Sequence, residues 1–471
     1  MSVFKRGFIF CLFFSAAGMG GCKKLVDVGA PSSSIITSAV FSNDATAITA
    51  QLSAYAKLMS YVFYFDQYTG LSSDELTNYN TSQVSIDIYR NTLNAPTDGG
   101  LNGLWSVWYN IIYQENSILE NVPLSTGMST RVKQLMMGEA YFNRAYWYFQ
   151  MVNLFGNVPL VTSTNYLINS TIPSTAAAQV YRQVVTDLQA AQGLLSSSYL
   201  DASDNTGATD RVRPTTWAAD ALLARVYLYM GKYDSAAQQA SLVINNSSMY
   251  SLVTDLTKVF KMNSQEAIWQ LTPPNGTLYT YDGQWFILIA PPGGSSISNS
   301  AAISPQLLAA FEPNDLRMAN WVNSYSQGGT TWYFPYKYRS TNVTATSLSE
   351  YYMVLRLGEQ YLIRAEAKAQ QHDLTGAAAD LNTIRQRAGL PPTTATTQAD
   401  LLTAIMHEGQ VELFTEEHRW FDLKRTKTVD SVMNIVIPQK GGGTWNTNQQ
   451  VYPLSSNDLL LNPNLTQNPG Y

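Results

Sequence analysis

Residues 222–240 read LLARVYLYMGKYDSAAQQA, and this stretch decides the fold. Apolar residues recur at helical spacing on both sides of Gly231-Lys232-Tyr233, which has the turn chemistry that separates two helices. Ala224 and Ala236 are small enough to let the two helices approach each other closely. The stretch therefore predicts a helical hairpin.

The spacing within this hairpin is that of a tetratricopeptide unit of about 34 residues. Its signature positions are filled by Leu223, Ala224, Tyr227, Gly231, Tyr233, Ala236 and Ala240. A second stretch matches in part, through Ala365, Lys368, His372, Leu374, Ala377, Leu381 and Ile384, with His372 where the turn glycine is expected. One full and one partial match do not make a long regular solenoid. We predict a mostly α fold, with a tetratricopeptide-like helical-hairpin scaffold and long irregular loop insertions.

Three more segments have helical spacing: residues 41–58, 105–122 and 138–154. The third is apolar on nearly every face, which predicts a buried helix, and Gly156 ends it. Its two charged residues, Glu139 and Arg144, are expected to have partners in the core.

Two zones lose this periodicity. Residues 66–100 are rich in Asp, Asn, Thr, Ser and Tyr, and we interpret them as a long exposed excursion. Residues 263–345 are punctuated by Pro and Gly pairs and concentrate Trp and Tyr. Short strands such as residues 285–289 are expected in the second zone, but no sheet of any size. Because binding residues gather on loops that a rigid scaffold holds, both zones are expected to face a ligand.

The first 22 residues resemble a bacterial lipoprotein signal. Lys5 and Arg6 precede an apolar run at residues 7–17, which is too short to span a bilayer, and Met19-Gly20-Gly21-Cys22 forms a cleavage box. Met19 stands where Leu is commoner. We predict a signal peptide at residues 1–21, lipidation of Cys22, a tether at residues 22–38 and a single domain at residues 39–471. An ordinary secretory signal with an incidental cysteine is the alternative.

The composition of the chain argues against several classes of function. If residues 1–21 are removed and Cys22 carries lipid, no thiol is left for a disulfide, a metal or a nucleophile, because Cys11 lies in the removed segment. The net charge of -5 argues against nucleic acid as a partner. Charged residues make up 13% of the chain and aromatic residues 12%, a balance that suits neutral, hydroxyl-rich ligands better than anions.

Three motifs are suggestive of an enzyme, but each has a plainer interpretation. His407-Glu408 lacks the second histidine of a zinc-protease helix, because Val411 stands in its place. Glu412 and Glu416, with Glu417, offer carboxylates for glycoside hydrolysis. Their spacing beside Arg419 and Lys424 is explained better by ion pairs on a helix surface. Residues 440–444 contain three glycines but lack the rest of a phosphate loop and predict a plain turn. We predict no catalytic residue, no metal and no cofactor.

Five separated motifs resemble the SusD/RagB family, the outer-membrane nutrient-binding lipoproteins of Bacteroidetes. They are Cys22-Lys23-Lys24-Leu25-Val26-Asp27 with Pro31, EAYFNRAYWYFQMVNLFGNVPLV at 139–161, LRLGEQYLIRAEAKAQQHDLTGAAADLNTIRQRAGL at 355–390, the Glu- and Arg-rich segment 405–425, and the end at 453–471. The resemblance covers essentially the whole mature chain.

The resemblance implies a function and a partner. A member of this family is a lipid-anchored protein of the outer membrane that faces the cell exterior and binds glycan or peptide without hydrolysing it. Its partner is a TonB-dependent, SusC-like transporter, over which it sits as a lid. Lys23 and Lys24 stand where an acidic cluster often directs such lipoproteins outward, so surface exposure is implied by the family alone. The alternatives are a glycoside hydrolase and a structural lid that binds peptide or no ligand.

Eight residues in the two irregular zones are our candidates for ligand binding. Sugar rings stack on aromatic side chains, and carboxylates and amides accept or donate bonds to hydroxyl groups. The candidates in the first zone are Asp74, Glu75, Tyr79 and Asn80, and those in the second are Trp285, Trp321, Trp332 and Tyr336.

Overall fold

The computed structural model of the protein describes residues 37–96, 99–273 and 276–471. Cys22, the predicted signal peptide and most of the predicted tether lie outside these residues. Helices make up most of the described chain, as predicted, and none of its described helices is long and apolar enough to cross a membrane.

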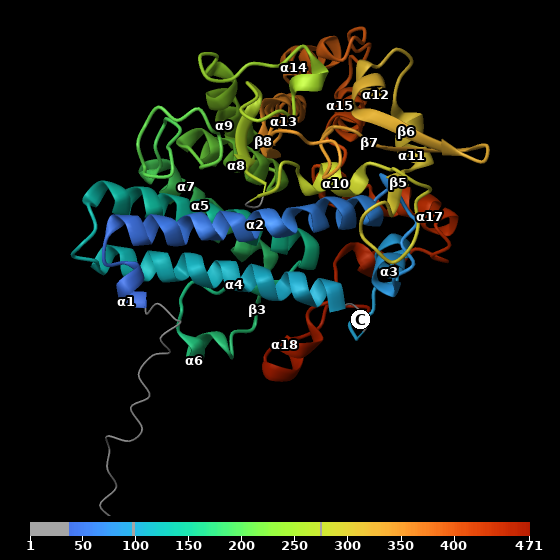
Figure 1. The fold of residues 1–471 in the computed structure, drawn as a ribbon. Coiled ribbons are helices and arrows are strands. Elements are labelled where there is room, and N and C mark those ends of the chain that lie inside the picture. The colour runs from blue at the N-terminus through green and yellow to red at the C-terminus, as the bar shows by residue number, and fades with distance from the viewer. Residues whose placement is uncertain (1–36, 97–98, 274–275) are drawn as a thin grey trace, which may run out of the picture.

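Three long helices run side by side through the first part of the chain (Figure 1). They are α2 (Asp44–Ser72), α4 (Gly99–Asn121) and α5 (Thr130–Phe155), and the shorter helices around them are α1 (Thr37–Val40), α3 (Gln83–Arg90) and α6 (Tyr166–Asn169). The three helices predicted at 41–58, 105–122 and 138–154 are confirmed, and each is longer than predicted, although α2 begins three residues later and α4 ends one residue earlier than expected. Gly156, with φ of 71°, ends α5 as expected.

A stack of helical hairpins forms the scaffold. Its members are α7 (Ala177–Leu194), α8 (Thr216–Tyr229), α9 (Tyr233–Asn245), α13 (Leu357–Gln370), α14 (Leu374–Arg387) and α15 (Gln398–Glu412). Each packs on the next, and α7 also packs on α5. Both predicted hairpins, α8–α9 and α13–α14, are confirmed. Gly231 and His372 occupy the same turn position with φ of 67° and 63°, so the histidine adopts the left-handed conformation of the glycine it replaces.

The strands are short and pair only in twos within the described residues. The antiparallel pairs are β1 (Leu76–Asn78) with β5 (Ala301–Ile303), β2 (Val158–Pro159) with β3 (Ser174–Thr175), β4 (Ala267–Leu271) with β8 (Tyr352–Arg356), and β6 (Val322–Gln327) with β7 (Thr330–Pro335). The remaining helices are α10 (Tyr281–Phe286), α11 (Pro305–Ala310), α12 (Leu316–Trp321), α16 (Arg419–Arg425), α17 (Val429–Gln439) and α18 (Ser456–Leu461). The strand expected at residues 285–289 is wrong, because Trp285 lies in α10.

The buried helix α5 pairs both of its predicted core charges. Glu139 accepts hydrogen bonds from Arg213 and from the Tyr55 hydroxyl, the latter at 2.6 Å. Arg144 donates to both carboxylate oxygens of Asp187, at 2.7 and 2.8 Å. All three partners and both α5 charges are buried, so these pairs tie α5 to its neighbours inside the core.

The expectation of an exposed excursion over residues 66–100 is wrong for its first part. Helix α2 continues to Ser72, and every residue from 66 to 76 is buried. Polar residues occur there because they make bonds inside the protein. Asp66, for example, accepts a 2.7 Å hydrogen bond from the Tyr352 hydroxyl. Polarity alone therefore did not indicate exposure.

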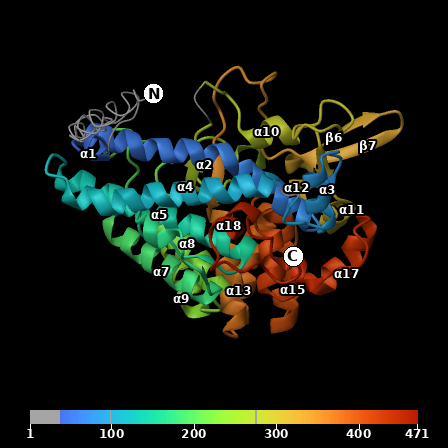
Figure 2. The same cartoon turned by 90° about the horizontal axis from the view of Figure 1, so that it is seen from below.

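In Figure 2, the hairpin helices α5, α7, α8, α9 and α13 lie on one side of α2, and α10 with β6 and β7 lies on the other. The part of the second zone that carries α10, β6 and β7 thus lies across α2 from the hairpins, whereas β4 of the same zone is buried against β8.

Candidate ligand-binding face

Four half-buried aromatic side chains gather on one small apolar cluster in the layer that carries β6 and β7. They are Tyr79, Tyr325, Trp332 and Tyr336, and we call them the aromatic face. The buried residues beneath them are Leu288, Ala302 and Phe334. Three of the eight predicted residues, Tyr79, Trp332 and Tyr336, are therefore brought together from segments far apart in the sequence.

The hairpin β6–β7 supplies two of these rings. Gly328 and Gly329 form its two-residue turn, with φ of 59° and 80°, a conformation that favours glycine at both positions. This turn sets Tyr325 opposite Trp332, and their ring centroids lie 6.4 Å apart. Since side chains alternate along a strand, the amides of Asn323 and Gln327 lie on the same side as Tyr325. The hairpin thus presents aromatic rings beside amide groups.

The other two rings are held by the surrounding loops. The Tyr79 backbone N–H donates to the Ser300 carbonyl at 2.8 Å, and the Tyr336 N–H donates to the Trp321 carbonyl at 2.7 Å. Asn80 is buried and donates from Nδ2 to the Ser296 carbonyl at 2.9 Å. The predicted residue Asn80 therefore positions the loop beside Tyr79 and does not itself lie open to a ligand.

Trp285 lies on α10 and packs on the main core, whereas the aromatic face packs on its own small cluster. Its ring stacks on Tyr281 with 4.4 Å between centroids and 8° between planes, and Phe63 of α2 packs edge-on behind it at 4.5 Å. Both Tyr281 and Trp285 are half-buried. The Trp285 carbonyl accepts the Asn299 N–H at 3.1 Å, which joins α10 to the loop that leads into β5. Trp285 and Tyr281 therefore form a separate pair of half-buried rings that packs on the main core.

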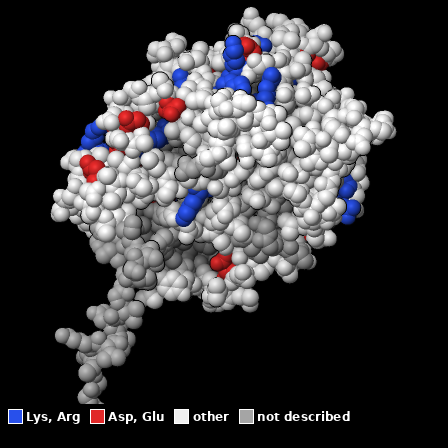
Figure 3. Space-filling view, viewed as in Figure 1, with Lys and Arg blue, Asp and Glu red and all other residues white. Residues whose placement is uncertain are grey.

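The surface around these rings is almost free of charge. The segments 283–311 and 318–336, which supply most of it, contain no Asp, Glu, Lys or Arg. Figure 3 shows the surface over α10, β6 and β7 as mostly uncharged. The nearest cation to the rings is Arg339, whose guanidinium lies 5.1 Å from the centre of the Tyr336 ring. Rings, amides and hydroxyls without charge are suited to a neutral ligand rich in hydroxyl groups.

Asp74 and Glu75 do not lie on this face. Asp74 is buried and accepts two hydrogen bonds of 2.7 Å from Arg419. Burial raises the pKa of Asp74, but the hydrogen bonds and charge of Arg419 outweigh it and hold that pKa below the usual range. Glu75 is also buried, and burial raises its pKa to about 8. Both side chains are buried inside the protein, so the prediction that they contact a ligand is corrected.

Trp321 is a core residue. Only 1% of it is exposed, its indole N–H donates to the Leu256 carbonyl at 2.9 Å, and Phe260 packs edge-on against it. The prediction that it stacks on a ligand is corrected for this reason. The sequence around Trp321 did not indicate that it is buried, because Trp321 and the accessible Trp332 occur in the same irregular zone.

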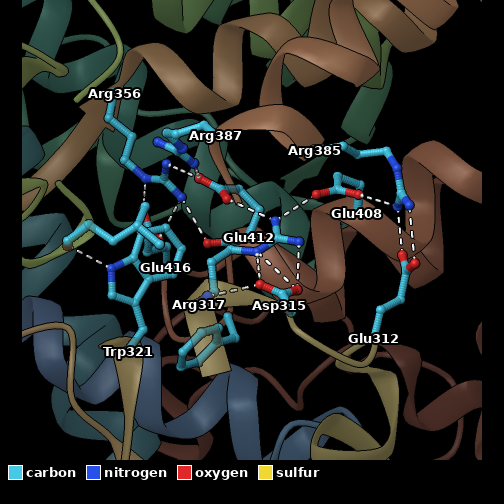
Figure 4. A network of polar contacts seen from close by, with 12 residues as sticks. Glu312, Asp315, Arg317, Trp321, Arg356, Arg385, Arg387, Glu408, Glu412 and Glu416 are labelled. Atoms are coloured by element: carbon cyan, nitrogen blue, oxygen red, sulfur yellow. Dashed lines mark hydrogen bonds and ion pairs between the residues drawn. The ribbon is translucent and has the colours of Figure 1, made fainter. Parts of the chain in front are cut away.

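The expected surface ion pairs of Glu412 and Glu416 are also corrected. Helix α15 ends at Glu412, which is completely buried between Arg317, Arg356 and Arg387 (Figure 4). Glu416 pairs with Lys337 and Arg356. The two predicted cations point elsewhere, because Arg419 pairs with Asp74 and Lys424 donates to the Asn153 carbonyl. Carboxylates held in this way stabilise the fold and are not available for hydrolysis.

A second set of buried acids lies where α10 meets α2, with Asp282 on α10 and Asp66 on α2. Asp282 is buried next to Asp66 at the base of the aromatic layer, and burial raises the pKa of Asp282 to about 7. Among the described residues, no group of three or more His, Cys, Asp or Glu is placed to hold a metal ion. These acids therefore belong to the interior of the protein.

Sequence reasoning missed Tyr325 and Tyr281. A signal for Tyr325 was present, because two strand-like runs around Gly328-Gly329 predict a hairpin, and its register places Tyr325 opposite Trp332. No comparable signal marked Tyr281, whose partner Trp285 lies one helical turn away in a helix that the sequence did not predict.

Comparison with known proteins places this chain among relatives of the same architecture. Residues 317–471 match the family described as "SusD family", and residues 28–228 match the one described as "Starch-binding associating with outer membrane". A curated relative, "SusD-like protein P2" of Formosa agariphila, is 26% identical over 442 residues, which cover 81% of this chain and 84% of the relative.

Solved structures share the fold. One described as "Laminarin binding SusD-like protein" superposes with a TM-score of 0.74 at 23% identity, covering 90% of this chain and 99% of the other. "Surface glycan-binding protein A" from Bacteroides uniformis superposes with a TM-score of 0.76 at 19% identity, with 90% and 99% covered. The mostly helical fold predicted from the sequence is thus confirmed.

Proposed function

This chain belongs to the SusD/RagB family, and we propose that it is a cell-surface lipoprotein that captures a neutral glycan on its aromatic face for uptake through the outer membrane. The family consists of binding proteins without catalytic activity. One observation carries the proposal: the half-buried rings of Tyr79, Tyr325, Trp332 and Tyr336 converge on one cluster, and segments 283–311 and 318–336, which supply most of the surface around it, contain no charged residue.

The geometry of this face suits a sugar chain. The C–H faces of a sugar ring pack on an aromatic ring, and its hydroxyls bond to amides such as those of Asn323 and Gln327. The rings are fixed by packing on Leu288 and Phe334, so little side-chain freedom is lost when a ligand binds. A neutral surface also avoids the cost of desolvating a charge beneath the ligand. The proposed ligand is therefore an uncharged oligosaccharide or polysaccharide.

We propose a TonB-dependent, SusC-like transporter as the partner, with the protein as a lid over it. The support is the family, one of whose matching descriptions names association with the outer membrane. The lipoprotein-like sequence around Cys22 supports a lipid anchor as the only attachment to the membrane. Two or three acyl chains are enough to hold such a domain at a membrane surface, and we propose the cell exterior as its location.

A panel of neutral and acidic polysaccharides in native gels tests this function. Laminarin belongs in the panel because a protein of the same fold is described as binding it. Retardation in a neutral glycan, without release of reducing ends, is the expected result. Release of reducing ends over time would support a glycoside hydrolase instead. Retardation in no glycan, together with intact association with the transporter, would favour a structural lid.

A further inference from the structure

Two protruding elements carry large apolar side chains that are left open to solvent. Helix α6 presents Tyr166, Leu167 and Ile168, and α18 ends in Leu460 and Leu461. Leu460, Leu167 and Leu461 are 84%, 80% and 79% exposed, the highest values among the large apolar residues that the structure describes. Figure 1 shows α6 and α18 projecting from the lower side of the molecule. We call these five residues the apolar tips.

The two elements are bonded into one surface. Asn462 donates from Nδ2 to the Ile172 carbonyl at 2.8 Å, and Asn464 donates to the Thr171 carbonyl at 2.7 Å. These bonds fix the segment after α18 against the segment after α6. The tips are therefore held together by the fold and do not move as independent loops.

The same surface continues to the start of the domain. The Thr164 backbone N–H, just before α6, donates to Glu120 at the end of α4 at 2.9 Å. The turn that follows α4 contains Leu124, which is 78% exposed and borders an open cavity with Phe41 and Ser42. That cavity adjoins α1, to which the segment after Cys22 is joined. The apolar tips thus lie on the side of the domain at which the chain enters it (Figure 1).

The segments that carry the tips are nearly free of charge. Residues 157–181 contain no charged residue, and residues 447–471 contain only Asp458. Asn165 caps α6 by accepting from the N–H groups of Leu167 and Ile168, at 3.1 and 3.4 Å. Backbone groups satisfied inside the protein lower the cost of entering a lipid environment, and aliphatic residues with a tyrosine suit the boundary between head groups and acyl chains.

We propose that the apolar tips insert into the surface of a lipid bilayer and set the orientation of the domain above it. This inference rests on the lipid anchor of the proposed function. Since an extended chain advances about 3.3–3.6 Å per residue, an anchor at Cys22 holds Thr37 within roughly 55 Å of the membrane, which limits distance but not orientation. Once the chain is anchored, insertion of the tips is an intramolecular event, so even a weak contact is populated.

Site-specific fluorescence tests this proposal in the lipidated, full-length protein. The mature chain has no free thiol once Cys22 is acylated, so Leu461→Cys offers a single site for an environment-sensitive dye. Val343→Cys is the matched control, because Val343 is 78% exposed and its neighbour Asn342 bonds to Gln284 of α10, far from the tips. Both proteins are reconstituted into vesicles of phosphatidylethanolamine and phosphatidylglycerol that contain a lipid-borne quencher. We expect several-fold stronger quenching at position 461 than at position 343.

Three outcomes would overturn the proposal. Equal, weak quenching at both positions in protein that floats with the vesicles would show that the tips stay in water. Shielding of position 461 only after the transporter is added would show that a protein covers the tips. Failure of the protein to float would contradict the anchor and with it this proposal, whereas the glycan panel would still report separately on binding.

Discussion

Glu412→Gln removes one negative charge from the centre of the buried ion network and should destabilise the protein strongly. Oε1 of Glu412 accepts from Arg356 at 2.5 Å and from Arg387, and Oε2 accepts from Arg317 at 3.0 Å. Glutamine has nearly the same shape, so the change leaves packing intact and tests the charge. Its NH₂ group would face a guanidinium, which has no acceptor to offer.

The size of the expected loss in the free energy of unfolding follows from the burial of these ion pairs. A pair of unit charges about 4 Å apart interacts with about 4 kcal/mol at an effective dielectric constant near 20, and desolvation offsets part of this. Removing one partner from a buried ion pair costs about 3–5 kcal/mol, because the remaining charges are left uncompensated. We expect the free energy of unfolding to fall by about this amount. The same arginines keep other carboxylate partners that limit the loss: Arg387 pairs with Glu266, Arg317 with Glu408 and Arg356 with Glu416.

Urea unfolding followed by circular dichroism measures the effect. Glu312→Gln is the matched control, because Glu312 lies at the rim of the same network, pairs with Arg385, and has a side chain that is 33% exposed. Pairs as accessible as this contribute about 1 kcal/mol or less. Equal losses in the two variants, or a loss below about 1 kcal/mol for Glu412→Gln, would refute the reasoning that the Glu412 carboxylate compensates the charges of the buried arginines around it.

The contribution of Glu412 to stability should depend on pH. Burial raises the pKa of Glu412, but the charges of Arg387, Arg356 and Arg317 outweigh it and hold that pKa well below its ordinary value. The carboxylate therefore contributes stability that is fully present above the pKa of the unfolded chain and is lost as the pH falls through the folded value. The difference between wild type and Glu412→Gln should be constant from about pH 8 to about pH 5 and shrink below that.

Three further predictions concern other parts of the chain. Trp321→Ala should lower the free energy of unfolding by about 3–5 kcal/mol in a urea titration, because it empties a fully packed core position; a loss below about 1 kcal/mol would place that side chain outside the core. Burial raises the pKa of Asp282 to about 7, so the wild type should lose stability as the pH rises from about 4 to about 7, and Asp282→Asn should lose less; parallel pH profiles would contradict this. Cys22→Ala should release the protein from membranes or block its maturation, as membrane fractionation would show, and a variant that stays membrane-bound would count against the anchor.

The scaffold was predictable because its signals are local. Helical spacing, the small residues Ala224 and Ala236 and the turn at Gly231 each act within a few residues, so the hairpins could be derived without knowledge of the rest of the chain. The same holds for α5, whose apolar faces indicated burial and whose two charges had to be paired.

The ligand face was predictable only in part, because exposure depends on contacts that are distant in sequence. Asp74 and Tyr79 are five residues apart, yet Asp74 is buried by Arg419 and Tyr79 lies half-open beside β7. Likewise, Trp321 is buried and Trp332 is half-buried, although both lie in the second irregular zone. In polar segments, composition pointed to the zones that hold the proposed ligand face, but the partner across the fold decided which side chains are accessible.

The most direct test of the central claim is calorimetric titration of the glycan identified by the gel panel into two neighbouring variants, Trp332→Ala and Tyr333→Ala. The two side chains leave β7 on opposite sides, and Tyr333 is 37% exposed, away from the aromatic face. Aromatic stacking is worth about 1–3 kcal/mol per ring in another class of ligand, and sugar stacking is expected near the lower end. We predict that Trp332→Ala weakens binding about fivefold to tenfold and that Tyr333→Ala leaves it unchanged. Wild-type affinity in Trp332→Ala, or an equal loss in both variants, would contradict the proposed ligand face.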